Sequence, residues 1–100
     1  MTKLSPAQKF YLAGAFDFKA WIKRSKGRYI LKMTCKHYSL AHMLVRKLGG
    51  LIEEVKNPKS AAYVWTVYGE KEIYKILAAL KVRNPKLQHV ARDLYDKYFG

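Results

Sequence analysis

Acidic residues are scarce in this sequence. Its 100 residues include seven Asp and Glu against twenty Lys and Arg, which gives a formal net charge of +13 at neutral pH. This imbalance argues for a polyanionic partner, with nucleic acid as the first candidate and an anionic membrane surface or an acidic protein as alternatives. Half of the residues are hydrophobic and 14% are aromatic. The chain is therefore expected to fold, and aromatic residues interleaved with basic charge favour nucleic acid.

The sequence also lacks the residues needed for several other kinds of site. Cys35 is the single cysteine, which excludes an intrachain disulfide and a zinc site built on cysteines. The three histidines lie at no familiar metal-ligand spacing, and no run approaches the ~20 apolar residues of a membrane-spanning helix. The N-terminus lacks a secretory signal. We therefore predict an intracellular protein without a cofactor, in a compartment such as an archaeal cytoplasm or an organelle.

Hydrophobic periodicity and breaker residues predict the order helix, hairpin, helix, hairpin, helix, helix. We expect one α+β domain over residues 1–100, with a four-stranded antiparallel sheet that is covered by helices on one face and open on the other. The first half is predicted to hold a helix over 7–16 begun by Ser5-Pro6, strands over 18–24 and 29–36, and a helix from Ser39 to Gly49-Gly50. The second half is predicted to hold strands over 51–56 and 61–68 around a turn at 57–60, and helices over 70–80 and from Asn84-Pro85 onward.

The first predicted hairpin is the most basic part of the chain, because residues 18–36 include seven basic residues and no acidic one. Lys23, Lys32 and Lys36 share one face if the strands alternate regularly. A charge run is often only a solvated surface, but a two-stranded ribbon of this kind fits the major groove of DNA. The predicted nucleic-acid-binding residues are Lys19, Trp21, Lys23, Lys26, Arg28, Lys32, Thr34, Lys36 and Thr66. One of Glu53 and Glu54 must also point to the open face.

The first predicted helix contains a glycine, Gly14, in an otherwise apolar stretch. Phe10, Leu12, Ala13 and Phe16 are the residues of this helix available for burial. A glycine inside a helix costs about 1 kcal/mol relative to alanine. We therefore expect another backbone to approach closely at Gly14.

The stretch over 11–20 resembles the LAGLIDADG motif of homing endonucleases. Four residues match motif positions one, two, three and six, namely Leu12, Ala13, Gly14 and Asp17. Residues 48–52, 63–69 and 80–82 are also similar to parts of that family, so the resemblance covers nearly the whole chain. It implies an αββαββα(α) fold and a homodimer joined through Leu12, Ala13, Gly14 and Asp17. The two sheets of such a dimer form a saddle on double-stranded DNA.

The chain departs from this family at the eighth motif position. The family has an Asp or Glu there, which binds the Mg²⁺ ions that activate water and stabilise the leaving oxygen. Here the position is Lys19, whose ammonium group has no free lone pair for a metal ion. Asp17 is a weak substitute ligand because it belongs to the helix end, and Arg83, near the family's basic residue that assists cleavage, does not replace the carboxylates. The resemblance therefore implies DNA binding with cleavage lost.

Two other functions remain open from the sequence. The same basic sheet would suit an RNA-binding protein, such as an intron maturase or a component of the ribosome or another RNP. Trp21 and Tyr68, if exposed, would then stack on bases. The second alternative is an active Mg²⁺-dependent site-specific endonuclease in which a partner subunit supplies the missing carboxylates.

Overall fold

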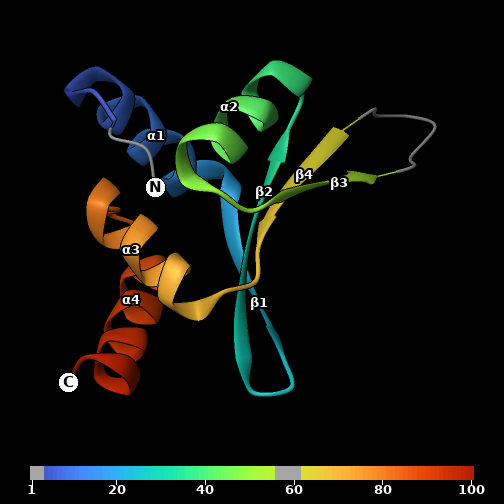
Figure 1. The fold of residues 1–100 in the computed structure, drawn as a ribbon. Coiled ribbons are helices and arrows are strands. Elements are labelled where there is room, and N and C mark those ends of the chain that lie inside the picture. Colours follow the sequence, from blue (N-terminus) through green and yellow to red (C-terminus); the bar gives the residue numbers. More distant parts are fainter. Residues whose placement is uncertain (1–3, 56–61) are drawn as a thin grey trace.

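A computed structural model of the chain describes residues 4–55 and 62–100 (Figure 1). Its helices are α1 (Pro6–Lys19), α2 (Tyr38–Leu48), α3 (Glu70–Leu80) and α4 (Pro85–Tyr98). Its strands are β1 (Ala20–Ser25), β2 (Arg28–Cys35), β3 (Leu51–Val55) and β4 (Ala62–Val67). In this described part no helix is long and apolar enough to cross a membrane. The turn predicted over 57–60 lies outside the described residues.

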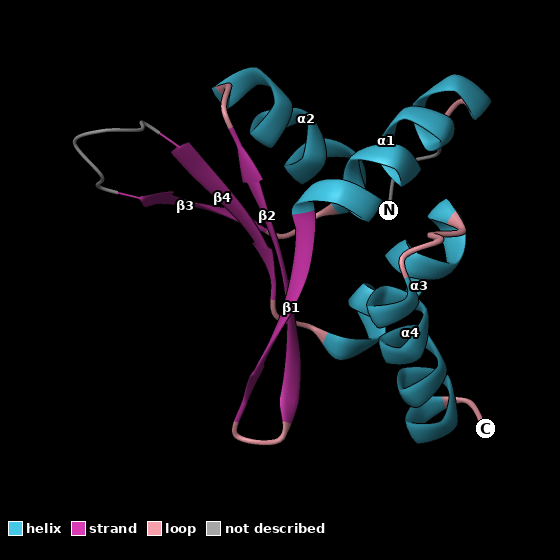
Figure 2. Cartoon of the chain, turned by 180° about the vertical axis from the view of Figure 1, so that it is seen from behind, coloured by secondary structure: helices cyan, strands magenta, loops and turns pink. Residues whose placement is uncertain are grey.

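The strands form a single antiparallel sheet in the order β1-β2-β4-β3. The helices lie together on one side of this sheet, as the views from the two sides show (Figures 1 and 2). The predicted α+β class, element order and one-sided cover by helices are therefore confirmed. An antiparallel sheet of this kind has one face in the core and one face toward solvent.

The core lies between the helices and the sheet. Leu31, Met33 and Trp65 are fully buried, and they alternate along β2 and β4 as the sequence pattern predicted. Phe16 of α1 packs edge-on against Trp65, with their ring centroids 5.6 Å apart. The Trp65 indole Nε1 donates a hydrogen bond of 2.8 Å to the carbonyl of Gly49, which satisfies its polar atom inside the core.

The hairpin between β1 and β2 has a two-residue turn. Lys26 and Gly27 both have positive φ, at 52° and 77°, and the flanking residues Ser25 and Arg28 pair with each other. Positive φ at both turn residues is the geometry of a type I′ turn, whose twist matches that of the strands. The turn therefore fixes the register that places every alternate residue of the hairpin on one face.

The structure corrects two predicted boundaries. Helix α1 does not end at Phe16 but continues to Lys19, so the first strand begins at Ala20 rather than at residue 18. Helix α2 begins at Tyr38 after an N-cap at His37, which places Ser39 inside its first turn. The predicted burial of Phe10 is also wrong, because this side chain is 85% exposed. Leu12 and Phe16 already supply the inward contacts of α1, and Phe10 lies on the opposite side of the helix.

Candidate nucleic-acid interface

The face of the sheet turned away from the helices is built by the cross-strand register. Residues directly opposite each other in an antiparallel pair project from the same face of the sheet. Trp21 pairs with Lys32, and Lys32 pairs with Thr66 on its other side. Thr66 pairs in turn with Leu51, so one row of side chains crosses all four strands. Trp21 is 41% exposed and Leu51 is 43% exposed. We call this side of the sheet the open face.

Several predicted binding residues lie on or next to the open face. Lys23 is two residues from Trp21 on β1 and therefore shares its face, and Thr34 holds the same relation to Lys32 on β2. Lys26 lies in the hairpin turn and Lys36 directly follows β2, and both are exposed. The hairpin thus presents basic side chains from the turn to the far end of β2. Thr66 is different, because its side chain is completely buried and cannot be reached directly by a ligand.

Glu53 interrupts this basic surface. It pairs with Val64, which lies on the open face together with Thr66, so Glu53 rather than Glu54 points to this side. Its Oε1 atom lies 3.5 Å from Lys32 Nζ and accepts a 2.8 Å hydrogen bond from the hydroxyl of Tyr68. The hydrogen bond from the Tyr68 hydroxyl, together with the nearby Lys32 ammonium, lowers the pKa of Glu53. The hydrogen bond to Glu53 raises the pKa of the Tyr68 hydroxyl.

The hydroxyl of Thr66 belongs to the same cluster. Its Oγ1 atom is buried and has no hydrogen-bond partner of acceptable geometry among the described residues. Buried hydroxyls nearly always have a partner, because an unpaired one loses its hydration without compensation. Lys32, Glu53, Thr66 and Tyr68 therefore form a polar cluster at the centre of the open face with one hydroxyl left to be satisfied. We call these four residues the open-face cluster.

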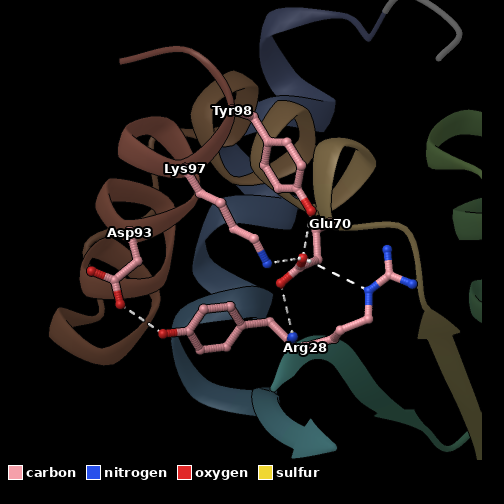
Figure 3. A network of polar contacts seen from close by, with 6 residues as sticks. Arg28, Glu70, Asp93, Lys97 and Tyr98 are labelled. Atoms are coloured by element: carbon pink, nitrogen blue, oxygen red, sulfur yellow. Dashed lines mark hydrogen bonds and ion pairs between the residues drawn. The ribbon is translucent and has the colours of Figure 1, made fainter. Parts of the chain in front are cut away.

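A second polar cluster lies between the hairpin and the helices on the other side of the sheet (Figure 3). Its centre is Glu70, the first residue of α3, which is only 2% exposed. The carboxylate accepts hydrogen bonds from Lys97 Nζ at 2.8 Å, from the Tyr98 hydroxyl at 2.6 Å and from the backbone N–H of Tyr29 at 3.1 Å. Arg28 Nε lies 3.8 Å from the same carboxylate, although 66% of the Arg28 side chain is exposed.

The contacts of Glu70 decide its charge. Burial opposes ionisation, but the donors on Lys97, Tyr98 and the Tyr29 backbone outweigh it and lower the pKa of Glu70 to about 2. Tyr29 also donates from its hydroxyl to Asp93 of α4 at 2.6 Å. One residue near the turn of the hairpin is thereby tied to both α3 and α4. The sequence indicated acidic residues in the first turn of α3, but gave no sign that Glu70 would be buried.

Helix α1 exposes an apolar stripe on the side opposite its core contacts. Phe10 and Phe18 are 85% and 91% exposed, and Gly14 lies midway between them at four-residue spacing. A Cβ atom on Gly14 would meet nothing within 4 Å in the described part of the chain. The close backbone approach expected at this glycine therefore does not occur within these residues. A groove of about 470 Å³ beside Gly14 is lined by residues that include Phe10, Leu80 and Arg83.

The other predicted contacts of this helix are distributed differently. Leu12 is fully buried in the core and faces away from the exposed stripe, whereas Ala13 is half-buried beside Gly14. Asp17 is half-buried, and its Oδ1 atom accepts hydrogen bonds of 2.9 Å from the backbone N–H groups of both Arg83 and Asn84. Asn84 Nδ2 donates in turn to the carbonyl of Asp17 at 3.1 Å. Asp17 thus joins the end of α1 to the start of α4.

No protein-family model and no curated protein sequence matches the chain. Solved structures do match. The homing endonuclease I-CvuI, solved in complex with DNA, has a TM-score of 0.69 and 15% identity over 88% of this chain and 66% of its own. The archaeal intron-encoded homing endonuclease I-Vdi141I, also in complex with DNA, has a TM-score of 0.69 and 18% identity over 94% of this chain and 70% of its own. The chain has the LAGLIDADG homing endonuclease fold.

A third similar structure differs in length. The I-SmaMI LAGLIDADG homing endonuclease bound to cleaved DNA has a TM-score of 0.62 and 23% identity, covering 96% of this chain but 37% of its own. The chain therefore spans about two thirds of I-CvuI and little more than a third of I-SmaMI. At these identities the likeness concerns the arrangement of helices and strands.

Lys19, at the eighth position of the LAGLIDADG-like stretch, and the nearby Asp17 do not fit a divalent metal ion. Lys19 is the exposed last residue of α1, and its ammonium group offers no lone pair. It lies near Cys35, where its charge partly opposes the burial that raises the pKa of the thiol. Asp17 directs its Oδ1 atom to two backbone N–H groups. Across residues 4–55 and 62–100 no three His, Cys, Asp or Glu side chains gather where they could hold a metal ion.

Proposed function

We propose that this chain binds double-stranded DNA through the open face and does not cleave it. The observation that carries the proposal is the alignment of Trp21, Lys23 and Lys32 on a two-stranded ribbon that the described helices leave uncovered. Such a ribbon fits the major groove of B-DNA, where lysine side chains reach both phosphates and base edges. The DNA complexes among the similar structures support the same ligand class.

The residues at the end of α1 support the proposed loss of cleavage. Nucleases of this fold need a carboxylate where this chain has Lys19, and the Asp17 carboxylate is already occupied by Arg83 and Asn84. A lysine ammonium at this position instead neutralises a DNA phosphate, which contributes to affinity through counterion release. The position thereby changes from a metal ligand to a phosphate contact.

The exposed stripe of α1 supports the proposal that two copies associate through this helix. Phe10 and Phe18 leave two large aromatic side chains in water, and the absence of a Cβ atom on Gly14 lets another backbone approach closely between them. A pair of chains joined in this way would present two open faces to one duplex. The proposed assembly is therefore a homodimer.

The binding surface is tested by fluorescence anisotropy with a labelled duplex over a series of salt concentrations. The double variant Lys23→Ala/Lys32→Ala is expected to bind more weakly and to reduce the slope of log K against log[salt] by at least about 1, because a lysine that contacts a phosphate contributes about 0.9. The matched control is Lys75→Ala/Arg92→Ala, which removes the same charge from exposed positions on α3 and α4. Equal salt slopes for both double variants would exclude the open face as the contact surface.

The loss of cleavage is tested by incubating the protein and a plasmid carrying its bound sequence with Mg²⁺. We expect no strand scission. Scission that disappears in Asp17→Asn would show that the motif retains its metal-binding function and would overturn this part of the proposal.

The dimer is tested at Gly14 by combining sedimentation with urea denaturation. In the isolated chain, Gly14→Ala should raise helix stability by up to about 1 kcal/mol, because the new Cβ atom lies in open space. In the assembly the same methyl group should weaken self-association, and Gly14→Leu should weaken it further. A wild-type chain that stays monomeric with duplex bound, or variants that associate as tightly as wild type, would rule out this interface.

RNA binding is the second candidate function, and one specific observation favours it. Trp21 and Tyr68 are 41% and 49% exposed and both project from the open face, where unpaired bases could stack on them. Stacking on an aromatic side chain is worth about 1–3 kcal/mol per base. A large loss of affinity for single-stranded RNA in Trp21→Ala, with RNA bound more tightly than duplex DNA, would replace the DNA proposal with this one.

A further inference from the structure

Glu53 is the only carboxylate that the described part of the structure places on the open face. Glu54 projects from the opposite face of β3, and the other acidic residues belong to α1, α3 and α4. A carboxylate in the middle of a surface that meets DNA repels the phosphates and lowers affinity for every sequence. Such a residue contributes to specificity when it makes a hydrogen bond that one base offers and another does not.

The surroundings of Glu53 keep its carboxylate charged and fixed in position. The Tyr68 hydroxyl donates to Oε1 at 2.8 Å, and Lys32 Nζ lies 3.5 Å from the same oxygen. These contacts involve Oε1, and 40% of the Glu53 side chain is exposed. The carboxylate therefore keeps acceptor positions that face outward. The Lys32 ammonium, which has three donors, lies directly beside it.

This arrangement of acceptor and donor matches a C·G pair best. An A·T pair also presents an amino donor, adenine N6, but that group lies between the N7 and O4 acceptors, which would face the carboxylate on both sides. In the major groove a C·G pair presents the N4 amino donor of cytosine next to the O6 and N7 acceptors of guanine. We propose that Glu53 is a specificity-determining residue that accepts a hydrogen bond from cytosine N4, while Lys32 donates to the guanine of the same pair. The inference rests on the proposed binding of duplex DNA by the open face.

The same geometry rejects other ligands. Thymine presents O4 and guanine presents O6 and N7, which are acceptors that would face the negative charge of Glu53. The major groove of an A-form RNA helix is too deep and narrow for a sheet to reach its base edges. The partner that this cluster fits is therefore B-form DNA with a cytosine at one defined position of each bound site.

The test is selection from a random duplex library by three proteins: wild type, Glu53→Gln and Glu54→Gln. Glu54 is exposed and adjacent in sequence but projects from the other face, so Glu54→Gln makes the same charge change away from the DNA. Wild type and Glu54→Gln should enrich cytosine at one position of each site. Glu53→Gln should lose this preference while binding the unselected library at least as tightly as wild type.

Binding to the selected duplex then measures how strongly the protein discriminates between bases at the enriched position. Replacing the enriched C·G pair by T·A should weaken wild-type binding about 10- to 100-fold, which corresponds to the usual discrimination by one specific base contact. For Glu53→Gln the two duplexes should bind within about twofold of each other. Tyr68→Phe, which removes the hydroxyl that positions Glu53, should reduce the discrimination between the two duplexes.

The selection distinguishes a failure of the proposed DNA binding from a failure of base recognition by Glu53. If none of the three proteins retains duplex DNA, the proposed function and this inference are both wrong. If all three retain it and Glu53→Gln enriches the same bases as wild type, the open face binds DNA but Glu53 does not read a base. Enrichment of a base other than cytosine that depends on Glu53 also contradicts the assignment. Circular dichroism spectra that match among the variants ensure that differences in selection do not arise from unfolding.

Discussion

The molecule contains two clusters with the same three residue types in opposite surroundings. In each, a glutamate accepts a hydrogen bond from a tyrosine hydroxyl and pairs with a lysine ammonium. One consists of Glu70, Tyr98 and Lys97 behind the hairpin, and the other of Glu53, Tyr68 and Lys32 on the open face. Their chemistry is alike, so the differences between them arise from burial and from additional donors.

The buried cluster leaves its carboxylate little freedom. Glu70 is 2% exposed and also accepts the backbone N–H of Tyr29, so both of its oxygens are bonded within the fold. Glu53 keeps 40% of its side chain in solvent, and a surface ion pair contributes little to stability. The comparison shows that a Glu–Tyr–Lys cluster holds the fold together when it is buried and satisfied. The same cluster on an open face remains available to a ligand.

The largest expected effect is on folding, from Glu70→Gln. This substitution removes the buried negative charge that accepts hydrogen bonds from Lys97, Tyr98 and the Tyr29 backbone. Lys97 and Arg28 are 49% and 66% exposed and stay solvated without it, so we expect a cost of about 3 kcal/mol, the order of hydrogen bonds to a charged group. Urea denaturation should show a loss of this order in the free energy of unfolding. Glu53→Gln is the matched control and should leave the urea midpoint nearly unchanged. Equal losses in the two variants would remove the distinction drawn between the clusters.

The pH dependence of stability should also distinguish the buried Glu70 cluster from the open-face cluster. The pKa of Glu70 is about 2 in the folded chain against an ordinary value of 4.5, so its stabilising effect is complete above pH 4.5 and is lost as the pH falls toward 2. The difference corresponds to about 3 kcal/mol. The free energies of unfolding of wild type and Glu70→Gln should therefore converge over this interval. A gap between them that stays constant down to pH 2 would contradict the lowered pKa.

The smallest effects are expected from removing the tyrosine hydroxyls. Tyr98→Phe takes a 2.6 Å hydrogen bond from a buried carboxylate and should cost about 1–3 kcal/mol of stability in thermal or urea unfolding. Tyr68→Phe should give no measurable change in stability, because water can replace its hydroxyl beside Glu53. A destabilisation by Tyr68→Phe as large as that by Tyr98→Phe would show that the open-face cluster also supports the fold.

Most of the fold was predictable because it depends on local patterns. The alternation of residues 29–36, the turn residues Lys26 and Gly27, and the apolar stripe of α3 each repeat within a few positions, so they identify strands, turns and helices. The end of α1 was not predictable in this way. The sequence places Asp17 at the end of the helix, but its carboxylate bonds to the backbone of Arg83 and Asn84, and the helix continues past it to Lys19.

The sites depended on contacts that no local pattern contains. Lys32 and Glu53 are brought together by β4, which lies between their strands, and Tyr29 meets Glu70 from 41 positions away. Thr66 likewise lies between Lys32 of β2 and Leu51 of β3, which are distant from it in sequence. The sequence indicated which hairpin is basic and that one of two glutamates must face the open side. It could not identify Tyr68 and Lys32 as the partners of Glu53. Nor could it identify Glu70 as the carboxylate that accepts a hydrogen bond from the backbone of Tyr29 in the hairpin.

The attachment of Tyr29 to both α3 and α4 makes the hairpin a stiff element close to its turn. In the proposed complex, a stiff ribbon would not bend to follow the curvature of a duplex, so the adjustment of shape would fall on the DNA. Bending or unstacking a duplex costs energy that depends on its base steps, with pyrimidine–purine steps the most compliant. In the proposed DNA complex, the position of the half-buried Tyr29 would thereby favour flexible steps at positions that no side chain of this protein touches.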